Sequence, residues 1–321
     1  MSLPPAVAAV RLAVRRALAD VDPGRDVVVA CSGGADSLAL LAATVFEGHR
    51  AGWRVVGATV DHGLQDGSAE HAARVVAQMG ELGADETFSA TVHVETAGLG
   101  PEAAARRARY AVLGEIAERV GAAAVLLGHT RDDQAETVLL GLARGSGGRS
   151  LAGMRRSFDG FVRPLLDLSR VETVTACQVE GIDYWSDPHN EDPGFARVRV
   201  RRRVLPVLED QLGPGVAEAL ARTADQLRED MDLLDDAAEA AYDDLRELPV
   251  EGLLAQRAPI RRRVLRLAAL DAGAPASELF HEHVLAMDAL LTGWHGQKWV
   301  DLPGKVRCRR ADGRLHLDRA G

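Results

Sequence analysis

The sequence predicts an α/β protein built on a doubly wound parallel sheet, followed by a smaller, mainly helical domain with a C-terminal hairpin. In the first half of the 321 residues, short β-branched apolar runs alternate with helical patterns, which is typical of strands and crossover helices in a parallel sheet. Beyond residue 206 helical periodicity dominates, and a strand pattern returns only near the end. We therefore expect one domain over residues 1–206 and a second over residues 207–321.

Each element of the first domain follows from its local pattern. A helix over Pro4–Asp20 is expected to lead, and Asp22-Pro23-Gly24 to end it. The expected strands cover residues 27–31, 54–60, 86–94, 123–127 and 161–165. The expected helices cover residues 38–50 and 68–82, a long stretch from Pro101, and a stretch from about Asp132. Ligands of such sheets lie at the carboxyl ends of the strands, so the turns at 32–37, 61–63 and 129–133 are expected to share one edge.

The second domain is expected to begin with a long acidic helix over about Pro214–Arg246, which connects the two domains. Shorter helices are expected over residues 259–271 and 277–291. Strand patterns at 298–310 and 314–317 flank Ala311-Asp312-Gly313, which is typical of a hairpin turn.

The turn after the first strand reads Ser32-Gly33-Gly34-Ala35-Asp36-Ser37. Glycines let backbone N–H groups approach a ligand, and the helix start adds unpaired donors and the positive end of its dipole. An ordinary βα turn capped by serine is the alternative. Asp36 favours the anion site, because an acid in a phosphate-binding turn that has no lysine implies Mg²⁺ between the acid and the phosphate. The chain has no Walker A loop, since its one Gly-Lys pair is followed by Val306.

This turn resembles the SGGxDS loop of the N-type ATP pyrophosphatases, the PP-loop family. The resemblance implies cleavage of ATP between its α and β phosphates, with an adenylated intermediate and pyrophosphate as products. It makes the whole turn an expected ATP-binding segment, composed of Ser32, Gly33, Gly34, Ala35, Asp36 and Ser37.

Residues from three further segments are expected near this turn. Asp61 and His62 end the second strand, where they are expected to contact the nucleotide, and His129 follows the fourth. Arg106 and Arg109 share a face of the helix from Pro101, and a guanidinium suits phosphate oxygens or the charge that develops in adenylation. A pair of surface arginines is the alternative for this helix.

Asp133 and Glu136 stand three residues apart at a predicted helix start, so they share a face. Beside a phosphate-binding turn, two such carboxylates suit a substrate amine or a metal, whereas a solvated acidic first turn is the alternative. The apolar positions of this helix are expected to face the core, namely Ala135, Val138, Leu139 and Leu142.

The net charge of −9 conceals a segregated charge distribution. Residues 225–251 hold eleven acidic residues against two arginines, so the remainder is neutral overall. Such a chain can still steer a polyanion to one face. The candidates for contact with a polyanion are five arginines that fall inside seven positions, namely Arg197, Arg199, Arg201, Arg202 and Arg203.

Several motifs in order make the resemblance more specific, and they are similar to those of the tRNA(Ile)-lysidine synthase family. They are SGGADS (32–37), VDHGL (60–64), EAAARRARY (102–110), LGHTRDDQAETVLL (127–140), RGSGGRSLAGM (144–154), RPLL (163–166) and DPHNEDPGFARVRVRRRVLP (187–206). The resemblance implies an adenine nucleotide alpha hydrolase-like first domain, the PP-loop catalytic domain, and a second domain that recognises tRNA.

The family reaction supplies the expected chemistry. ATP adenylates the C2 oxygen of the wobble cytidine in the CAU-anticodon isoleucine tRNA, and the ε-amine of free L-lysine then displaces AMP to give lysidine. The resemblance implies catalytic roles for Asp36, Arg109 and His129, and a lysine-binding role for Asp133 and Glu136. It also implies that the five arginines of residues 197–203 bind tRNA. The chain's only lysines, at positions 298 and 305, lie in its tail, so lysine is expected as a free substrate.

Two other functions compete with this prediction. A tRNA 2-thiolation enzyme could use the same loop, but it usually needs paired cysteines, and Cys31, Cys177 and Cys308 are far apart. A non-catalytic nucleotide- or RNA-binding module would not need Asp36 together with Arg109. The dispersed cysteines suit a reducing cytoplasm, and no run approaches the ~18 apolar residues of a membrane span. The oligomeric state is left open, with a homodimer as one option.

Overall fold

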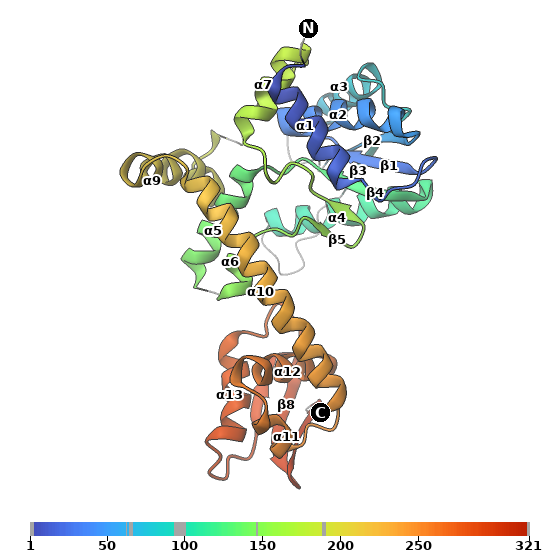
Figure 1. Ribbon diagram of the computed structural model, residues 1–321. Coiled ribbons are helices and arrows are strands. Elements are labelled where there is room, and N and C mark those ends of the chain that lie inside the picture. The colour runs from blue at the N-terminus through green and yellow to red at the C-terminus, as the bar shows by residue number, and fades with distance from the viewer. Residues whose placement is uncertain are drawn as a thin grey trace. The chain divides into compact units, whose positions relative to one another are not determined.

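The computed structural model describes residues 3–61, 63, 67–92, 101–145, 147–187 and 191–319, with only the backbone described for 101–103. The chain divides into two compact units (Figure 1). The first comprises residues 1–144 and 153–223, and the second comprises residues 145–152 and 224–321. This division falls inside helix α10 (Val216–Asp244), and the domain boundary at residue 206 stays a prediction.

The first unit contains a six-stranded sheet in the order β3-β2-β1-β4-β6-β5, in which every neighbouring pair except β6 and β5 is parallel. This order confirms the predicted doubly wound α/β class. The strands are β1 (Asp26–Ala30), β2 (Arg54–Asp61), β3 (Glu86–Thr91), β4 (Ala122–Leu127), β5 (Ser157–Phe158) and β6 (Phe161–Val162). Ala30 is in register with Ala58 on one side and Leu127 on the other. The carboxyl ends of β1, β2 and β4 therefore lie together.

Helices cover both faces of this sheet. The buried valines of β1 alternate between the two faces, as a strand buried on both sides requires. Val27 and Val29 join a core with α1, α2, α3 and α7, whereas Val28 packs with Leu113 and Ile116 of α4 on the other face. The helices of this unit are α1 (Pro5–Ala17), α2 (Ala35–Ala51), α3 (Ser68–Glu81), α4 (Pro101–Val120), α5 (Arg131–Arg144), α7 (Arg170–Glu180), α8 (Ala196–Arg199) and α9 (Leu205–Leu212), with a π-helix, η2, over Val200–Val204.

The structure departs from the sequence predictions in several places. The strand expected over residues 298–310 is divided into two strands by the short helix η3 (Pro303–Lys305). Strands β5 and β6 are two residues each and form a small hairpin, where one strand over 161–165 was expected. Helix α7 was not predicted, although Ser169 and Glu172 form a capping box at its start, a pattern that a sequence can reveal. The expectation that Leu142 faces the core is wrong, since its exposed fraction is 59%.

The second unit has its own hydrophobic core, built from helices and a three-stranded antiparallel sheet in the order β7-β8-β9. Strands β8 and β9 form the predicted hairpin around residues 311–314. Its further elements are α6 (Gly148–Leu151), α11 (Val250–Ala255), α12 (Ala258–Asp271), α13 (His281–Thr292), β7 (Val300–Leu302), η3 (Pro303–Lys305), β8 (Val306–Ala311) and β9 (Arg314–Arg319).

Two negative findings hold for the described part of the chain. None of its helices is long and apolar enough to cross a membrane. The three cysteines are buried and free, with no disulfide among them.

Candidate active site

The turn from β1 into α2 has the geometry of an anion-binding site. The hydroxyl of Ser37 donates to the carbonyl oxygen of Gly34 at 2.9 Å and accepts from the N–H of Ser32 at 3.2 Å. These bonds tie the start of the turn to the first turn of α2, which begins at Ala35. The first N–H groups of a helix have no intrahelical acceptors, and they lie at the positive end of its dipole. The turn therefore presents rigid donors to an anion.

Two glycines make this turn sterically feasible. Gly33 has a φ of +80°, and a Cβ atom there would lie 2.8 Å from Val75. A Cβ atom at Gly128, just after β4, would lie 3.0 Å from the backbone of Asp36 and Ser37. A side chain at either position would collide or strain the backbone. Gly128 thus allows the loop after β4 to pack directly against the phosphate-binding turn.

A cavity of about 850 Å³ opens at the carboxyl ends of β1, β2 and β4. It brings together residues from eight separate stretches of sequence, at the edge where a doubly wound sheet binds its ligands. The predicted site residues that line it are Ser32, Gly34, Ala35, Asp36, Ser37, Asp61, Arg109, His129, Asp133, Arg197, Arg201 and Arg202.

Other predicted site residues lie elsewhere. Glu136 is fully buried beneath the cavity lining, one helical turn from Asp133. The guanidinium of Arg199 donates to the carbonyl oxygens of Pro193 and Gly194, and Arg203 is exposed. His62 lies outside the described residues.

An alternating chain of acids and arginines runs through the site and joins the turn to the basic stretch. Arg170 bridges Asp36 and Asp133, Arg201 bridges Asp133 and Glu136, and Arg197 approaches Glu136. The successive N···O distances are 3.5, 3.0, 3.3, 2.5 and 3.6 Å. Three carboxylates thus face three guanidinium groups. Charge balance of this kind is what permits ionised groups to be buried.

The three carboxylates differ in their pKa. Burial raises the pKa of Asp36, although Arg170 and the Thr173 hydroxyl, which donates to it, act in the opposite direction. Burial also raises the pKa of Glu136, against the effect of Arg201. Burial alone would raise the pKa of Asp133, but Arg170 and the Thr130 N–H together hold it below the ordinary value.

His129 is neutral at physiological pH. Burial lowers its pKa to about 3, and three nearby arginines add to the effect against Asp133. Its Nδ1 atom is buried and finds no hydrogen-bond partner within the described residues. A neutral imidazole with an unused nitrogen can exchange a hydrogen bond with a substrate.

Arg106 and Arg109 are separated by the structure. Arg109 lines the cavity at the phosphate-binding turn, whereas Arg106 lines a different cavity. Desolvation lowers the pKa of Arg109, but an arginine stays charged near neutral pH. Of the two, Arg109 is therefore the one placed beside the predicted ATP site.

Sequence reasoning missed several residues of this cavity. Arg170 and Thr173 come from α7, the helix that was not predicted, and both contact Asp36. The Nε2 atom of His71 donates to the Ser32 carbonyl oxygen at 3.0 Å, and the His71 ring lies 3.9 Å from that of Trp185. The capping box of α7 was the one usable signal, since nothing in the local pattern around His71 or Trp185 indicates their pairing.

The residues present fit a magnesium ion that is bound mainly through substrate phosphates. No group of three or more acidic, histidine or cysteine side chains that could hold a metal occurs in the part of the chain that the structure describes. Mg²⁺ commonly keeps its waters and takes only one or two carboxylates together with substrate phosphates. Asp36 lines the cavity at the phosphate-binding turn, so it can supply one such carboxylate.

Comparisons with known proteins place the chain in a family. A family model described as a PP-loop domain matches residues 9–208, and one described as the TilS substrate binding domain matches residues 248–316. The tRNA(Ile)-lysidine synthase of Thermobifida fusca (strain YX) is 56% identical, and the alignment covers 97% of each chain. That of Streptomyces coelicolor (strain ATCC BAA-471 / A3(2) / M145) is 51% identical with the same coverage. The chain belongs to the tRNA(Ile)-lysidine synthase family.

Membership in the tRNA(Ile)-lysidine synthase family makes the chain an ATP-dependent ligase of tRNA modification with a PP-loop domain. Among solved structures, the U34-tRNA thiolase NcsA from Methanococcus maripaludis with its [4Fe-4S] cluster aligns with a TM-score of 0.58 and 19% identity. The alignment covers 70% of this chain and 80% of that one. This likeness supports the fold alone, and it agrees with the doubly wound sheet described above.

Proposed function

We propose that this chain adenylates the C2 oxygen of the wobble cytidine in the CAU-anticodon isoleucine tRNA and joins free L-lysine to C2 through the ε-amine. The observation that carries the proposal is the single cavity that holds the phosphate-binding turn, Arg109, His129 and Asp133. A nucleotide, a base and an amine could meet there. The products are lysidine, AMP and pyrophosphate.

The ATP part of the site follows from its charges. The N–H groups of the turn and the dipole of α2 stabilise the pyrophosphate leaving group, and Arg109 stabilises charge at the reacting phosphate. Asp36 would hold Mg²⁺, which offsets the negative charge of the phosphates when bound. His129, neutral and with a free Nδ1 within the described residues, would hydrogen-bond the cytidine.

The lysine part of the site uses both signs of charge. Asp133 and Glu136 would bind the α-ammonium group, as the family resemblance implies. Their present partner, Arg201, lies between them at 3.3 and 2.5 Å, where it can take the α-carboxylate of the same lysine. This arrangement leaves the ε-amine free to attack.

The tRNA would bind through exposed positive charge. Arg202 and Arg203 are exposed, and Arg202 pairs at the surface with Glu191. Arg197 and Arg201 contact the acids of the cavity, so their part in tRNA binding would be at the cavity itself. Residues 207–321 would recognise the rest of the tRNA. We place the protein in the cytoplasm, where its substrates are. The oligomeric state stays open, and a measurement of molecular mass in solution would distinguish a homodimer from a monomer.

The test is incubation with ATP, labelled lysine and transcribed isoleucine tRNA, followed by digestion to nucleosides. We expect labelled lysidine and one AMP per lysidine. The Asp36→Asn variant should lose AMP formation by at least 100-fold, because removal of one charge-stabilising group typically costs that much, whereas the matched surface variant Asp22→Asn should retain it. Asp36→Asn with normal turnover would contradict the metal-binding role.

The lysine site has a separate test. Glu136→Gln should raise the lysine concentration needed for half-maximal rate much more than the ATP concentration, because Glu136 is assigned to the ammonium group. Equal changes for both substrates would remove Glu136 from the lysine site. A sulfur-containing nucleoside instead of lysidine would favour thiolation, and absence of AMP would favour a binding module.

A further inference from the structure

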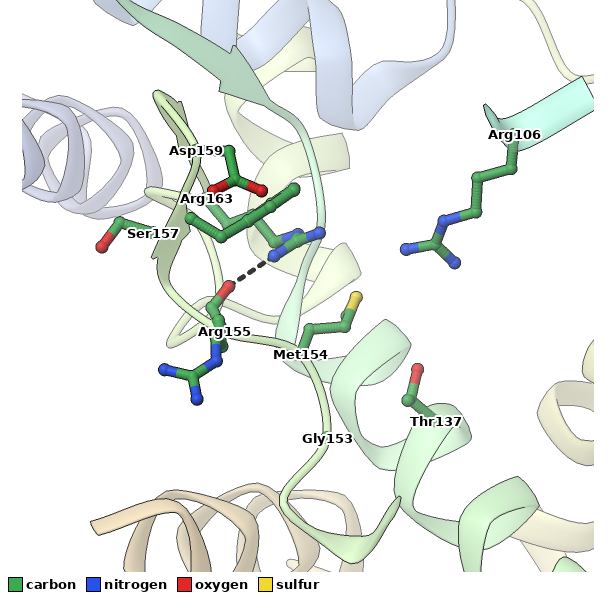
Figure 2. A pocket seen from close by; sticks show the side chains of 9 residues that line it. Arg106, Thr137, Gly153, Met154, Arg155, Ser157, Asp159 and Arg163 are labelled. Atoms are coloured by element: carbon green, nitrogen blue, oxygen red, sulfur yellow. Dashed lines mark hydrogen bonds between the residues drawn. The ribbon is translucent and has the colours of Figure 1, made fainter. Parts of the chain in front are cut away.

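A second cavity, of about 670 Å³, lies in the first unit beside the predicted active site. The described residues that form it come from α4, α5 and the segment 153–163 (Figure 2). Its lining is strongly basic, with Arg106, Arg155 and Arg163 against a single acid, Asp159. The function derived above makes no use of this cavity.

Two of these arginines face one another. Figure 2 shows the guanidinium groups of Arg106 and Arg163 turned toward each other across the cavity. Neither group forms an ion pair with a carboxylate in the described part of the chain. The Tyr110 hydroxyl accepts from both at 3.3 Å, and it is neutral. Like charges that face each other repel, so this geometry is suited to an anion that binds both groups beside that hydroxyl.

Arg163 is held in place for such a role. It is 5% exposed, its Nη1 donates to the carbonyl oxygen of Arg155 at 2.5 Å, and its Nη2 donates to the hydroxyl of Tyr110 at 3.3 Å. Its Nε atom is buried and has no hydrogen-bond partner within the described ranges. Both of its partners are neutral acceptors. A buried cation without a counter-charge is unfavourable, and a phosphate group would relieve this cost.

An aromatic surface adjoins the cations. The guanidinium carbon of Arg163 lies 4.4 Å from the centre of the Phe158 ring. Phe158 stacks on Phe161 and meets the edge of Tyr110. Aromatic rings and arginine planes beside cationic groups are the features on which single-stranded RNA bases stack while their phosphates are neutralised.

The second cavity adjoins the first. The hydroxyl of Thr137 lines the second cavity and accepts from Arg197 at 3.1 Å, and Arg197 lines the first. Arg106 and Arg163 also act electrostatically on His129, another residue of the first cavity. A ligand that fills both cavities must therefore continue past Thr137 and Arg197, as a nucleotide chain can.

We propose that this second cavity binds the nucleotide next to the reacting cytidine, with its phosphate between Arg106 and Arg163 and its base against Phe158. The proposal rests on the proposed function, because it takes tRNA as the ligand. It assigns Arg106 to substrate positioning, apart from Arg109 at the ATP site.

The test compares Arg106→Ala with Arg107→Ala, a neighbouring exposed arginine of the same helix outside the cavity. The affinity for full-length isoleucine tRNA is measured as a function of salt, and ATP binding without tRNA is measured by calorimetry. We expect Arg106→Ala to weaken tRNA binding roughly tenfold and to reduce the salt slope by about 1. Arg107→Ala should match the wild type, and ATP binding should be unchanged in both.

A photo-crosslink tests the position directly. Transcribed tRNA with a photoreactive nucleotide beside the reacting cytidine should crosslink to a peptide from residues 153–163 in the wild type, and more weakly in Phe158→Leu. Crosslinks confined to other peptides, or identical tRNA binding by the Arg106→Ala and Arg107→Ala variants, would overturn the assignment while wild-type lysidine formation stands. Wild-type protein that makes no lysidine would overturn the proposed function as well.

Discussion

At the scale of single residues, burial changes what a side chain can do. Glu136 and Asp133 are three positions apart, and the sequence predicts their shared face from that spacing alone. Their environments differ, because Glu136 is fully buried whereas Asp133 borders the cavity. The guanidinium groups that neutralise them come from α7 and η2, and no local pattern indicates those pairings.

His129 carries a prediction about protonation. Its pKa is lowered to about 3, chiefly by burial, so the neutral ring is the form present in the folded protein from pH 5 to 8. An unfolded histidine takes up its proton near pH 6.5. The folded protein therefore loses stability as the pH falls below that value, because only the unfolded chain binds the proton.

NMR of the ring nitrogens checks this prediction. We expect the His129 signals, identified by their loss in His129→Gln, to show no titration midpoint between pH 5 and 8. A midpoint inside that interval would mean that the ring is not desolvated in solution.

At the scale of elements, the π-helix η2 determines where the arginines of residues 201–203 point. Its wider turn over Val200–Val204 is of the kind often found at functional sites. Within it, Arg201 reaches Asp133 and Glu136, whereas Arg202 pairs at the surface with Glu191. The five arginines of residues 197–203 look alike in sequence, but some of them line the cavity at its acids and others are exposed to solvent.

This division predicts different costs of substitution. Arg201→Ala should lower the free energy of unfolding by about 3 kcal/mol, because it removes the closer of the two cations that neutralise the buried Glu136. Arg202→Ala, the matched control, should cost at most about 1 kcal/mol, as an exposed pair does. Urea unfolding measures both values.

A second substitution separates charge from packing. In the background of Arg201→Ala, the change Glu136→Gln should recover part of the lost stability, since the uncompensated charge is then gone. If Arg201→Ala costs no more than Arg202→Ala, the pair between Arg201 and Glu136 is not formed in solution.

At the scale of the whole molecule, each of the two units has hydrophobic cores of its own. The cores of the first unit lie on the two faces of the parallel sheet, and the core of the second lies among α11, α12, α13 and the small antiparallel sheet. The cavity with the phosphate-binding turn belongs to the first unit.

Because the two units have separate hydrophobic cores, we expect two unfolding transitions in calorimetry. ATP with Mg²⁺ should raise the transition of the first unit and leave the other unchanged, because a ligand stabilises only the structure that binds it. At about 100 times its dissociation constant, the ligand adds about 2.7 kcal/mol. Hydrogen exchange assigns each transition to its residues. A single transition that shifts as a whole would show that the units unfold together.

The sequence by itself determined the features that depend on local pattern. The β-branched runs, the glycines of the turn and the spacing of Asp133 and Glu136 predict strands, an anion site and a shared helical face. The location of the cavity at the carboxyl ends of the strands follows from the doubly wound class, whereas the strand order was not predicted. The ordered motifs also sufficed for the family.

Tertiary structure decided which distant residues meet. The chain of ion pairs from Asp36 through Arg170 and Arg201 to Glu136 joins four stretches of sequence, and it depends on how α7 and η2 pack beside α5. The assignment of Arg106 and Arg109 to separate cavities likewise depends on what surrounds α4. The physical reason is that burial and charge pairing arise from contacts distant in sequence, whereas periodicity and turn chemistry arise from neighbours.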